Sequence, residues 1–121
     1  MRRRPTRAIV PKPGSDLLLF EGFDCVGALR ALGEDTRVRI MGLLLEAPLG
    51  VCEIARRIGT THYNVSKHLR VLRDAGLLDV EKHGRERLYG VPERIRRGRG
   101  ARLKVLDLGC CSFRFDSDLK N

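Results

Sequence analysis

Residues 51 to 73 constrain the fold most, because they read as two short helices joined by a tight turn. Ile54 and Ile58 give the first helix one apolar face, and Ala55 is small enough for a second helix to cross closely over it. Gly59 supplies the turn, where a positive φ would strain other residues. The second helix has its own apolar face, made of Val65, Leu69 and Leu72. The spacing predicts a helix-turn-helix.

The other face of the second helix is polar and contains no acidic residue. Nearly all of its side chains donate or accept hydrogen bonds, and they are Thr61, His62, Tyr63, Asn64, Ser66, Lys67 and Arg70. A helix that is apolar on one side and carries this set on the other suits a DNA major groove. The alternative is an ordinary helical hairpin with a solvated polar face.

Two predicted strands follow directly and favour the DNA-binding interpretation. Leu77–Lys82 and Glu86–Val91 read as strands, and His83-Gly84-Arg85 forms a glycine-containing hairpin between them. A two-stranded ribbon after a helix-turn-helix is a wing. Arg85 and Arg87 lie at or near its tip, within reach of phosphates or a minor groove. The alternative is a plain hairpin that covers the core.

The rest of the chain divides into three parts. Residues 1–14 form a basic arm, residues 15–92 form the winged helix-turn-helix domain, and residues 93–121 form a C-terminal segment with sensor cysteines and dimer contacts. Within the domain we expect a first helix over 15–32 and a second that begins at a cap, Asp35 or Thr36, and stops at Pro48. Thr60 or Thr61 caps the second helix of the helix-turn-helix, which we call the reading helix, and Gly76 ends it. The fold class is mainly α with a small β-hairpin wing. The pattern leaves residues 93–115 open between helix and strand.

The charge balance points to an anionic partner. The net charge is +9 and the isoelectric point is about 10.1, which favours nucleic acid or an anionic surface. No apolar run approaches the roughly 18 residues of a membrane span, and no secretory signal follows the first arginines. We therefore expect a cytoplasmic protein with reduced thiols, whose four cysteines are ligands, sensors or core residues rather than a disulfide framework.

Several stretches together resemble the ArsR/SmtB repressors over about residues 28 to 92. They are Ala31–Ile40, Val51–Ala55, Val65–Leu69, Leu72–Leu77 and the wing that ends in Leu88-Tyr89. The resemblance implies a dimeric winged-helix repressor that binds a palindromic operator and lets go when a metal or metalloid binds. It adds His68 to the reading residues. Arsenic repressors of this family often carry two cysteines at the start of the first helix of the helix-turn-helix. Here the corresponding stretch is Gly50-Val51-Cys52, which has one cysteine. The histidines of the family's zinc and nickel sensors are also missing after His83.

The adjacent cysteines Cys110 and Cys111 are the sharpest chemical feature. Neighbouring thiols can reach one soft ion, but they do not suit two positions of a tetrahedral zinc site. Trivalent arsenic and antimony prefer two or three thiolates, so we predict that Cys110 and Cys111 bind one of them, with Cys52 of either subunit as a third ligand. Cys25 stays open as the alternative third ligand, although its place on an apolar helix face also suits core packing.

The sequence thus predicts a dimeric, operator-binding repressor that is released by trivalent arsenic or antimony. A thiol redox switch of the same fold is the first alternative, and a basic nucleic-acid-binding protein without a sensor is the second. No nucleophile, base and orienting group can be assembled from the spacing, so we do not expect an enzyme. The sequence names neither the operator nor the choice among arsenite, antimonite and methylated forms.

Overall fold

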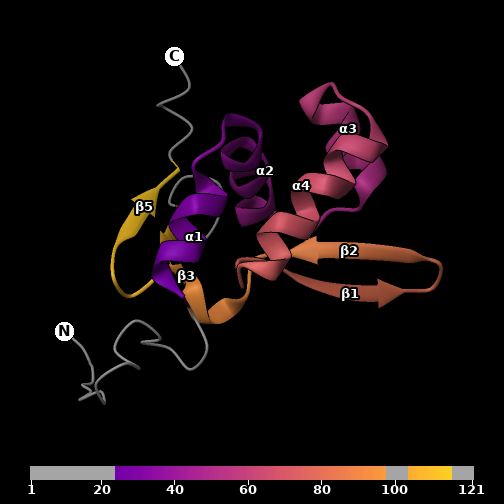
Figure 1. Ribbon diagram of the computed structural model, residues 1–121. Coiled ribbons are helices and arrows are strands. Elements are labelled where there is room, and N and C mark those ends of the chain that lie inside the picture. Colours follow the sequence, from indigo (N-terminus) through magenta and orange to yellow (C-terminus); the bar gives the residue numbers. More distant parts are fainter. Residues whose placement is uncertain (1–23, 98–103, 116–121) are drawn as a thin grey trace.

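A computed structural model describes residues 24–97 and 104–115. The expected basic arm, residues 1–14, lies outside the described residues, as does the first part of the helix expected over 15–32. Within the described residues four helices come first, namely α1 (Cys25–Leu32), α2 (Asp35–Glu46), α3 (Val51–Ile58) and α4 (His62–Asp74). Two small antiparallel sheets follow them, and in Figure 1 these sheets lie on opposite sides of the helices.

The core lies where the apolar faces of the helices meet. Helix α1 contacts both α2 and α4, and α3 contacts α4. The side chains that are almost fully buried are mostly leucine and isoleucine, including Ile40, Leu44, Ile54, Val65, Leu69 and Leu72. Burying one such side chain contributes about 1.5–3 kcal/mol. The apolar face predicted for the reading helix, α4, is therefore confirmed as part of the core.

The helix starts match the predictions in one case and differ in another. Thr61 caps α4, since its side chain accepts the backbone N–H of Asn64 at 3.1 Å. The prediction that Asp35 or Thr36 caps α2 is wrong. Glu34 is the cap residue, and its carboxylate accepts the backbone N–H of Arg37 at 2.9 Å. The longer glutamate side chain reaches this N–H from an extended backbone, so the helix begins one residue earlier.

Two glycines take the left-handed backbone that the turns require. Gly59 has φ 84° between α3 and α4, and its N–H donates to the carbonyl of Ala55 at 2.8 Å. Gly76 also has φ 84° and follows Ala75, the residue that caps the end of α4. The predicted turns at both glycines are confirmed.

The predicted wing is present as strands β1 (Asp79–His83) and β2 (Glu86–Gly90). They pair antiparallel, with His83 opposite Glu86, so Gly84 and Arg85 make the connection. Leu77 and Leu78, expected in the first strand, are instead buried between α4 and β1. Leu49 joins the base of the ribbon through two backbone hydrogen bonds with Tyr89.

The C-terminal segment is mainly extended. A single turn of 3₁₀ helix, η1 (Glu93–Ile95), leads into β3 (Arg96–Arg97), β4 (Val105–Asp107) and β5 (Ser112–Arg114), which form one antiparallel sheet in that order. The question left open by the sequence is thus settled as strand for Arg96–Arg97, Val105–Asp107 and Ser112–Arg114, and as a single 3₁₀ turn for Glu93–Ile95. Cys111, Phe113 and Phe115 alternate along the extended segment and pack against the core.

Polar contacts hold this second sheet against α2. Lys104 is the one charged side chain that is buried among the described residues, and its Nζ lies 2.9 Å from Oε2 of Glu46. The Arg96 guanidinium donates to the carbonyl of Leu45. Both contacts fix the sheet at the end of α2. Within the described ranges, no helix is long and apolar enough to cross a bilayer.

Candidate DNA interface and cysteine cluster

The outward face of α4 presents the polar side chains that the sequence predicts. Thr61, His62, Tyr63, Asn64, Ser66, Lys67 and Arg70 are all exposed. Tyr63 is 71% exposed, which is unusual for an aromatic side chain in a small domain. Val65, Leu69 and Leu72 hold the opposite face in the core, so the orientation of the polar face is fixed by packing.

Side-chain contacts order the start of this face. The amide of Asn64 donates from Nδ2 to Oγ1 of Thr60 at 3.0 Å, next to the cap bond from Thr61. Nζ of Lys67 lies 5.4 Å from the centre of the Tyr63 ring, within cation–π range. Thr60, which positions Asn64, is not among the predicted reading residues, although a threonine four residues before an amide at a helix start is a usable signal.

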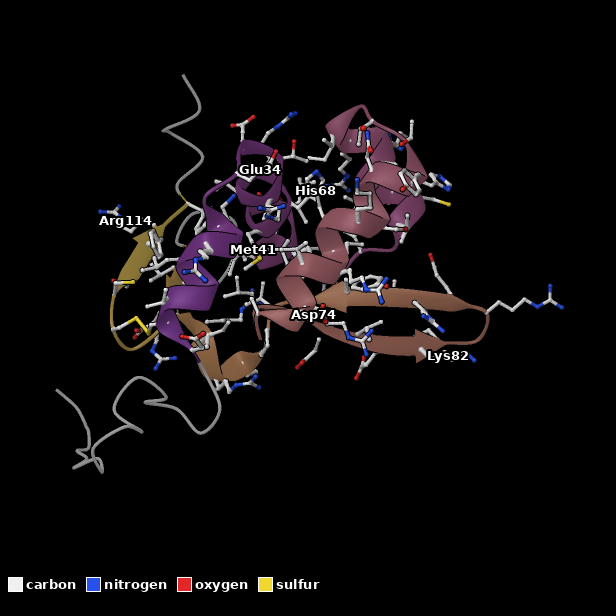
Figure 2. The ribbon with its side chains drawn as sticks, in the orientation of Figure 1. Glu34, Met41, His68, Asp74, Lys82 and Arg114 are labelled. Carbon is white, nitrogen blue, oxygen red and sulfur yellow. A yellow bond between two sulfur atoms is a disulfide. The ribbon has the colours of Figure 1, made fainter. Side chains whose placement is uncertain are left out.

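His68 lies apart from this outward face. Its side chain is 21% exposed, and its Nδ1 accepts a hydrogen bond from Nη1 of Arg37 at 3.2 Å. Nδ1 is also 3.9 Å from Oε1 of Glu34, and Figure 2 shows Glu34 and His68 close together. The N–H of Arg37 and the neighbouring cations lower the pKa of Glu34. The base-reading role that the family resemblance implied for His68 therefore does not follow from its position, which links α4 to α2.

The tip of the wing carries the predicted cations. Arg85 lies in the turn and Arg87 on β2, and both are exposed. Arg87 is directly opposite Lys82 in the ribbon. Two like charges at opposed positions repel each other, and a bound anion relieves that repulsion. The nearby histidine, His83, pairs with Glu81 at 3.1 Å.

Helix α3 carries its charges on the surface, beside the thiol of Cys52. Glu53 pairs with Arg56 and, at 2.7 Å, with Arg57. These hydrogen bonds lower the pKa of Glu53. Cys52 is exposed and is not disulfide-bonded.

Three of the four cysteines meet between α1 and the turn that joins β4 to β5. Cys25, the first residue of α1, is bonded to Cys110 in a disulfide, and Sγ of Cys110 lies 3.8 Å from Sγ of Cys111. The yellow sulfur atoms beside α1 and β5 mark this place in Figure 2. The expectation that the four thiols are free is wrong for this state of the molecule. Cys25 is 7% exposed, and its role is not limited to core packing.

Cys52 does not join this group within one chain. With Cys25 and Cys110 joined in a disulfide, no group of three or more His, Cys, Asp or Glu side chains in the part of the chain that the structure describes is placed to hold a metal ion. The sulfur atoms of Cys110 and Cys111 lie 3.8 Å apart, and their role as metalloid ligands stays a prediction. A ligand role for Cys52 would require the second subunit and also stays a prediction.

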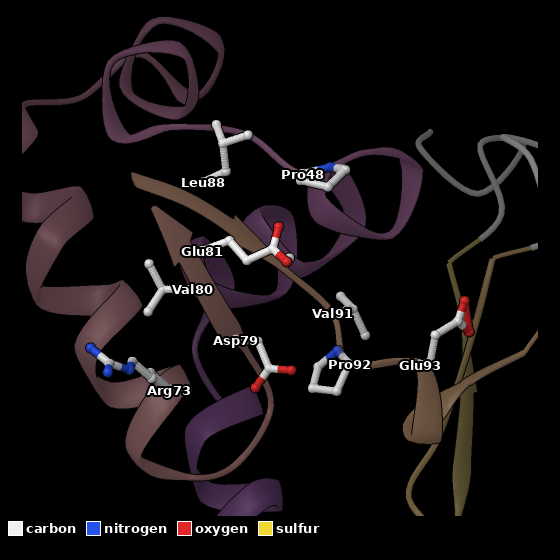
Figure 3. A pocket seen from close by; sticks show the side chains of 10 residues that line it. Pro48, Arg73, Asp79, Val80, Glu81, Leu88, Val91, Pro92 and Glu93 are labelled. Atoms are coloured by element: carbon white, nitrogen blue, oxygen red, sulfur yellow. The ribbon is translucent and has the colours of Figure 1, made fainter. Parts of the chain in front are cut away.

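A surface pocket at the base of the wing is a separate feature. It has a volume of about 460 Å³ and is lined by residues of the wing, the end of α4 and η1, including Arg73, Asp79, Glu81 and Glu93. Figure 3 shows these side chains with Pro48 and Pro92 at its edge. None of the predicted reading residues or cysteines lines it.

The fold and the exposed face define a class. A helix-turn-helix with a polar, acid-free reading face, followed by a cation-tipped β-ribbon, makes this chain a winged helix-turn-helix DNA-binding protein. Residues 34–80 match the family described as "Bacterial regulatory protein, arsR family". The chain is also 33% identical over 85 residues to the cadmium resistance transcriptional regulatory protein CadC homolog of Staphylococcus aureus, covering 69% of this chain and 70% of that protein. The chain belongs to the ArsR family of transcriptional regulators, and its relatives are regulators rather than enzymes.

Two solved structures show the same fold. One, described as a possible transcriptional regulator for arsenical resistance, is 34% identical with a TM-score of 0.53, covering 56% of this chain and 71% of that chain. The other is Mb0332 of Mycobacterium bovis, described as a homodimeric winged helix-turn-helix DNA-binding domain. It has a TM-score of 0.57 at 23% identity, covering 69% of this chain and 74% of that chain.

Proposed function

We propose that this protein is a dimeric repressor that leaves its operator when trivalent arsenic or antimony binds to cysteine thiolates, with Cys110 and Cys111 as ligands. The observation that carries the proposal is the 3.8 Å separation of their sulfur atoms. A thiolate bound at about 2.3 Å, the length found on zinc, allows two ligands of one ion to lie at most about 4.6 Å apart. The adjacent sulfurs meet this condition.

The DNA-binding half of the proposal rests on α4 and the wing. In a dimer, two α4 helices enter successive major grooves about 34 Å apart. The predicted base and backbone contacts come from Thr61, His62, Tyr63, Asn64, Ser66, Lys67 and Arg70, with Arg85 and Arg87 on the flanking phosphates or minor groove. Because phosphate contacts release counterions, operator affinity falls steeply with salt.

A second copy of the chain is supported by two observations. Mb0332, which shares the fold, is described as homodimeric. In this chain, three large apolar side chains on the first two helices, Val26, Leu29 and Val38, are exposed. Covering them in a dimer removes apolar surface from water.

The choice of inducer rests on the chemistry of sulfur. Vicinal thiols favour soft ions, and two relatives bear names that point to such ions, one to cadmium resistance and one to arsenical resistance. Arsenic and antimony suit two or three thiolates, whereas cadmium accepts four. The small number of available sulfurs favours the metalloids. The proposal requires the protein to be in the cytoplasm, where its operator is found and where thiols are kept reduced.

A titration of operator release tests the proposal. The reduced full-length protein is bound to a fluorescent promoter fragment, and anisotropy is followed while arsenite, antimonite, zinc, cadmium and peroxide are added separately. Release by micromolar arsenite or antimonite, but not by zinc, supports the proposal. Release by zinc or cadmium alone would contradict the assignment of the inducer.

A thiol redox switch is the second candidate, and the Cys25–Cys110 disulfide favours it. In that function, peroxide takes two electrons and two protons from the two thiols, which form the disulfide, and becomes two water molecules. Operator release by peroxide without any metalloid, reversed by dithiothreitol, is its distinguishing result.

A further inference from the structure

We infer that the third sulfur ligand is Cys25 of the same chain, and that the Cys25–Cys110 disulfide is the oxidised form of the site, which cannot take up the metalloid. The inference rests on the proposed function, because it assigns the ligands of the same inducer. It replaces Cys52 as the third ligand and places the whole site within one subunit.

The geometry carries the assignment. The sulfur of Cys110 is bonded to that of Cys25 and lies 3.8 Å from that of Cys111. The Cα atoms of Cys25 and Cys110 are 6.5 Å apart. Two thiols at this backbone distance can converge on one ion by rotation about their side-chain bonds, without a change of fold. Cys52, in contrast, is exposed at the start of α3.

The turn that carries Cys110 and Cys111 is held in shape by the backbone. The N–H of Leu108 donates to the carbonyl of Cys111 at 2.8 Å, and Gly109 has φ 90°. The N–H of Gly109 also donates to Oδ1 of Asp107 at 2.9 Å. A turn that is already closed loses little conformational freedom when its two thiols bind an ion, which favours tight binding.

Cys25 occupies a rigid place on the other side of the site. Its side chain is buried, and its Sγ lies 3.7 Å from the carbonyl oxygen of Leu108, which is itself fully buried. Reduction therefore leaves this thiol next to the turn and shielded from water, rather than free to move away. A ligand held on α1 also ties the turn to a helix that contacts α4.

The chemistry of the two states excludes their coexistence. A dithiol reductant such as dithiothreitol gives two electrons and two protons to the disulfide, which becomes two thiols, and the reductant becomes a cyclic disulfide. Arsenite, As(OH)₃, then forms three As–S bonds with three thiols while three water molecules leave, with no change in oxidation state. In the oxidised chain only Cys111 of this cluster remains a thiol, and one thiol does not hold the metalloid firmly.

Thiol counting on the full-length protein tests the inference without DNA. The reduced wild type has four thiols, and arsenite should protect all but Cys52. In Cys52→Ser, the matched control, arsenite should protect every remaining thiol with unchanged affinity. Cys25→Ser should bind arsenite at least about 10-fold more weakly, because it keeps only the vicinal pair. The oxidised wild type should bind at least as weakly as Cys25→Ser.

Operator affinity without arsenite is the folding control, and Cys25→Ser should match the wild type there. If Cys52→Ser weakens arsenite binding and Cys25→Ser does not, the assignment of Cys25 as the third ligand is wrong, and the proposed function still stands. Equal arsenite affinity of oxidised and reduced wild type would overturn the redox block. Absence of arsenite binding by the reduced wild type would overturn the inference and the proposed inducer together.

Discussion

The helix-turn-helix and the cysteine cluster are built from contacts of very different range. Helices α3 and α4 and the turn at Gly59 are made within residues 51–74, with core contacts from side chains at helical spacing. The cluster joins Cys25 to Cys110, which are 85 residues apart in the sequence. The first region is therefore specified locally, whereas the second exists only once the whole chain has folded.

A chain of contacts connects the two regions. Cys25 begins α1, and the carbonyl of Ala31 near its end accepts a hydrogen bond from Nε of Arg37 at 2.6 Å. Nη1 of the same guanidinium donates to His68 on α4 at 3.2 Å. Arg37 thus links α1 to the reading helix, in addition to the direct contact between α1 and α4. We propose that Arg37 carries part of the coupling between the cluster and DNA.

The largest expected effect is on the stability of the protein and comes from the disulfide of the cysteine cluster. Closing a long loop with a disulfide stabilises a domain by about 2–4 kcal/mol, mainly by restricting the unfolded chain. The oxidised wild type should therefore resist urea more than the reduced wild type by that amount, as measured by circular dichroism. Cys25→Ser should show no such difference between oxidising and reducing buffers. An equal midpoint for both forms of the wild type would mean that the disulfide adds no stability.

The next largest effect is on operator affinity and comes from the helix-turn-helix. Lys67→Glu places an acid on the reading face and should weaken operator binding by about 10–100-fold, as for the loss of one base or phosphate contact. Anisotropy at fixed salt measures this. Arg94→Glu makes the same charge change on η1 and should alter affinity much less. Equal losses for the two variants would show that only net charge matters, and that α4 does not read the DNA.

Arg37→Ala tests the connection between the regions. Coupling free energies between two sites are typically 1–3 kcal/mol, which is about 5–150-fold in affinity. The variant should bind arsenite as the wild type does but release the operator less completely. Arg39→Ala, an exposed position on the same helix, is the control. Unchanged release in Arg37→Ala would remove Arg37 from the coupling.

The smallest effects come from two glycines. Gly59→Ala should destabilise the protein by about 1–2 kcal/mol, because φ 84° strains a side chain although no atom lies within 4 Å. Gly42→Ala, inside α2, should instead stabilise it by about 0.5–1 kcal/mol, since its new Cβ meets only a ring carbon of Phe115 at 3.7 Å. Thermal unfolding of both variants measures the contrast, and a stabilised Gly59→Ala would contradict the role given to the turn.

The same contrast explains what the sequence could predict. The reading helix, its cap at Thr61, the turns at Gly59 and Gly76 and the wing all follow from local spacing, and all are present. The cap of α2 was missed because Glu34 and Asp35 are neighbouring acids and only the backbone decides between them. The orientation of His68 toward Arg37 depends on a contact across 31 residues.

The cysteine cluster shows the limit most clearly. The adjacent pair is visible in the sequence, and its chemistry follows from two neighbouring thiols. The approach of Cys25 to this pair is not visible in the sequence, because no local pattern says that the start of α1 lies against the turn between β4 and β5. The apolar helix face around Cys25 indicates that the side chain is buried. It does not distinguish a thiol packed in the core from a thiol that lies against another sulfur.

The role of the vicinal cysteines as the sensor is best tested by operator release with arsenite, compared between the reduced wild type and Cys110→Ser/Cys111→Ser. Both proteins should bind the promoter fragment equally in the absence of ligand. Micromolar arsenite should lower the anisotropy of the wild-type complex and leave that of the double variant unchanged. Equal release from both complexes would place the sensor elsewhere in the molecule and contradict the proposed function.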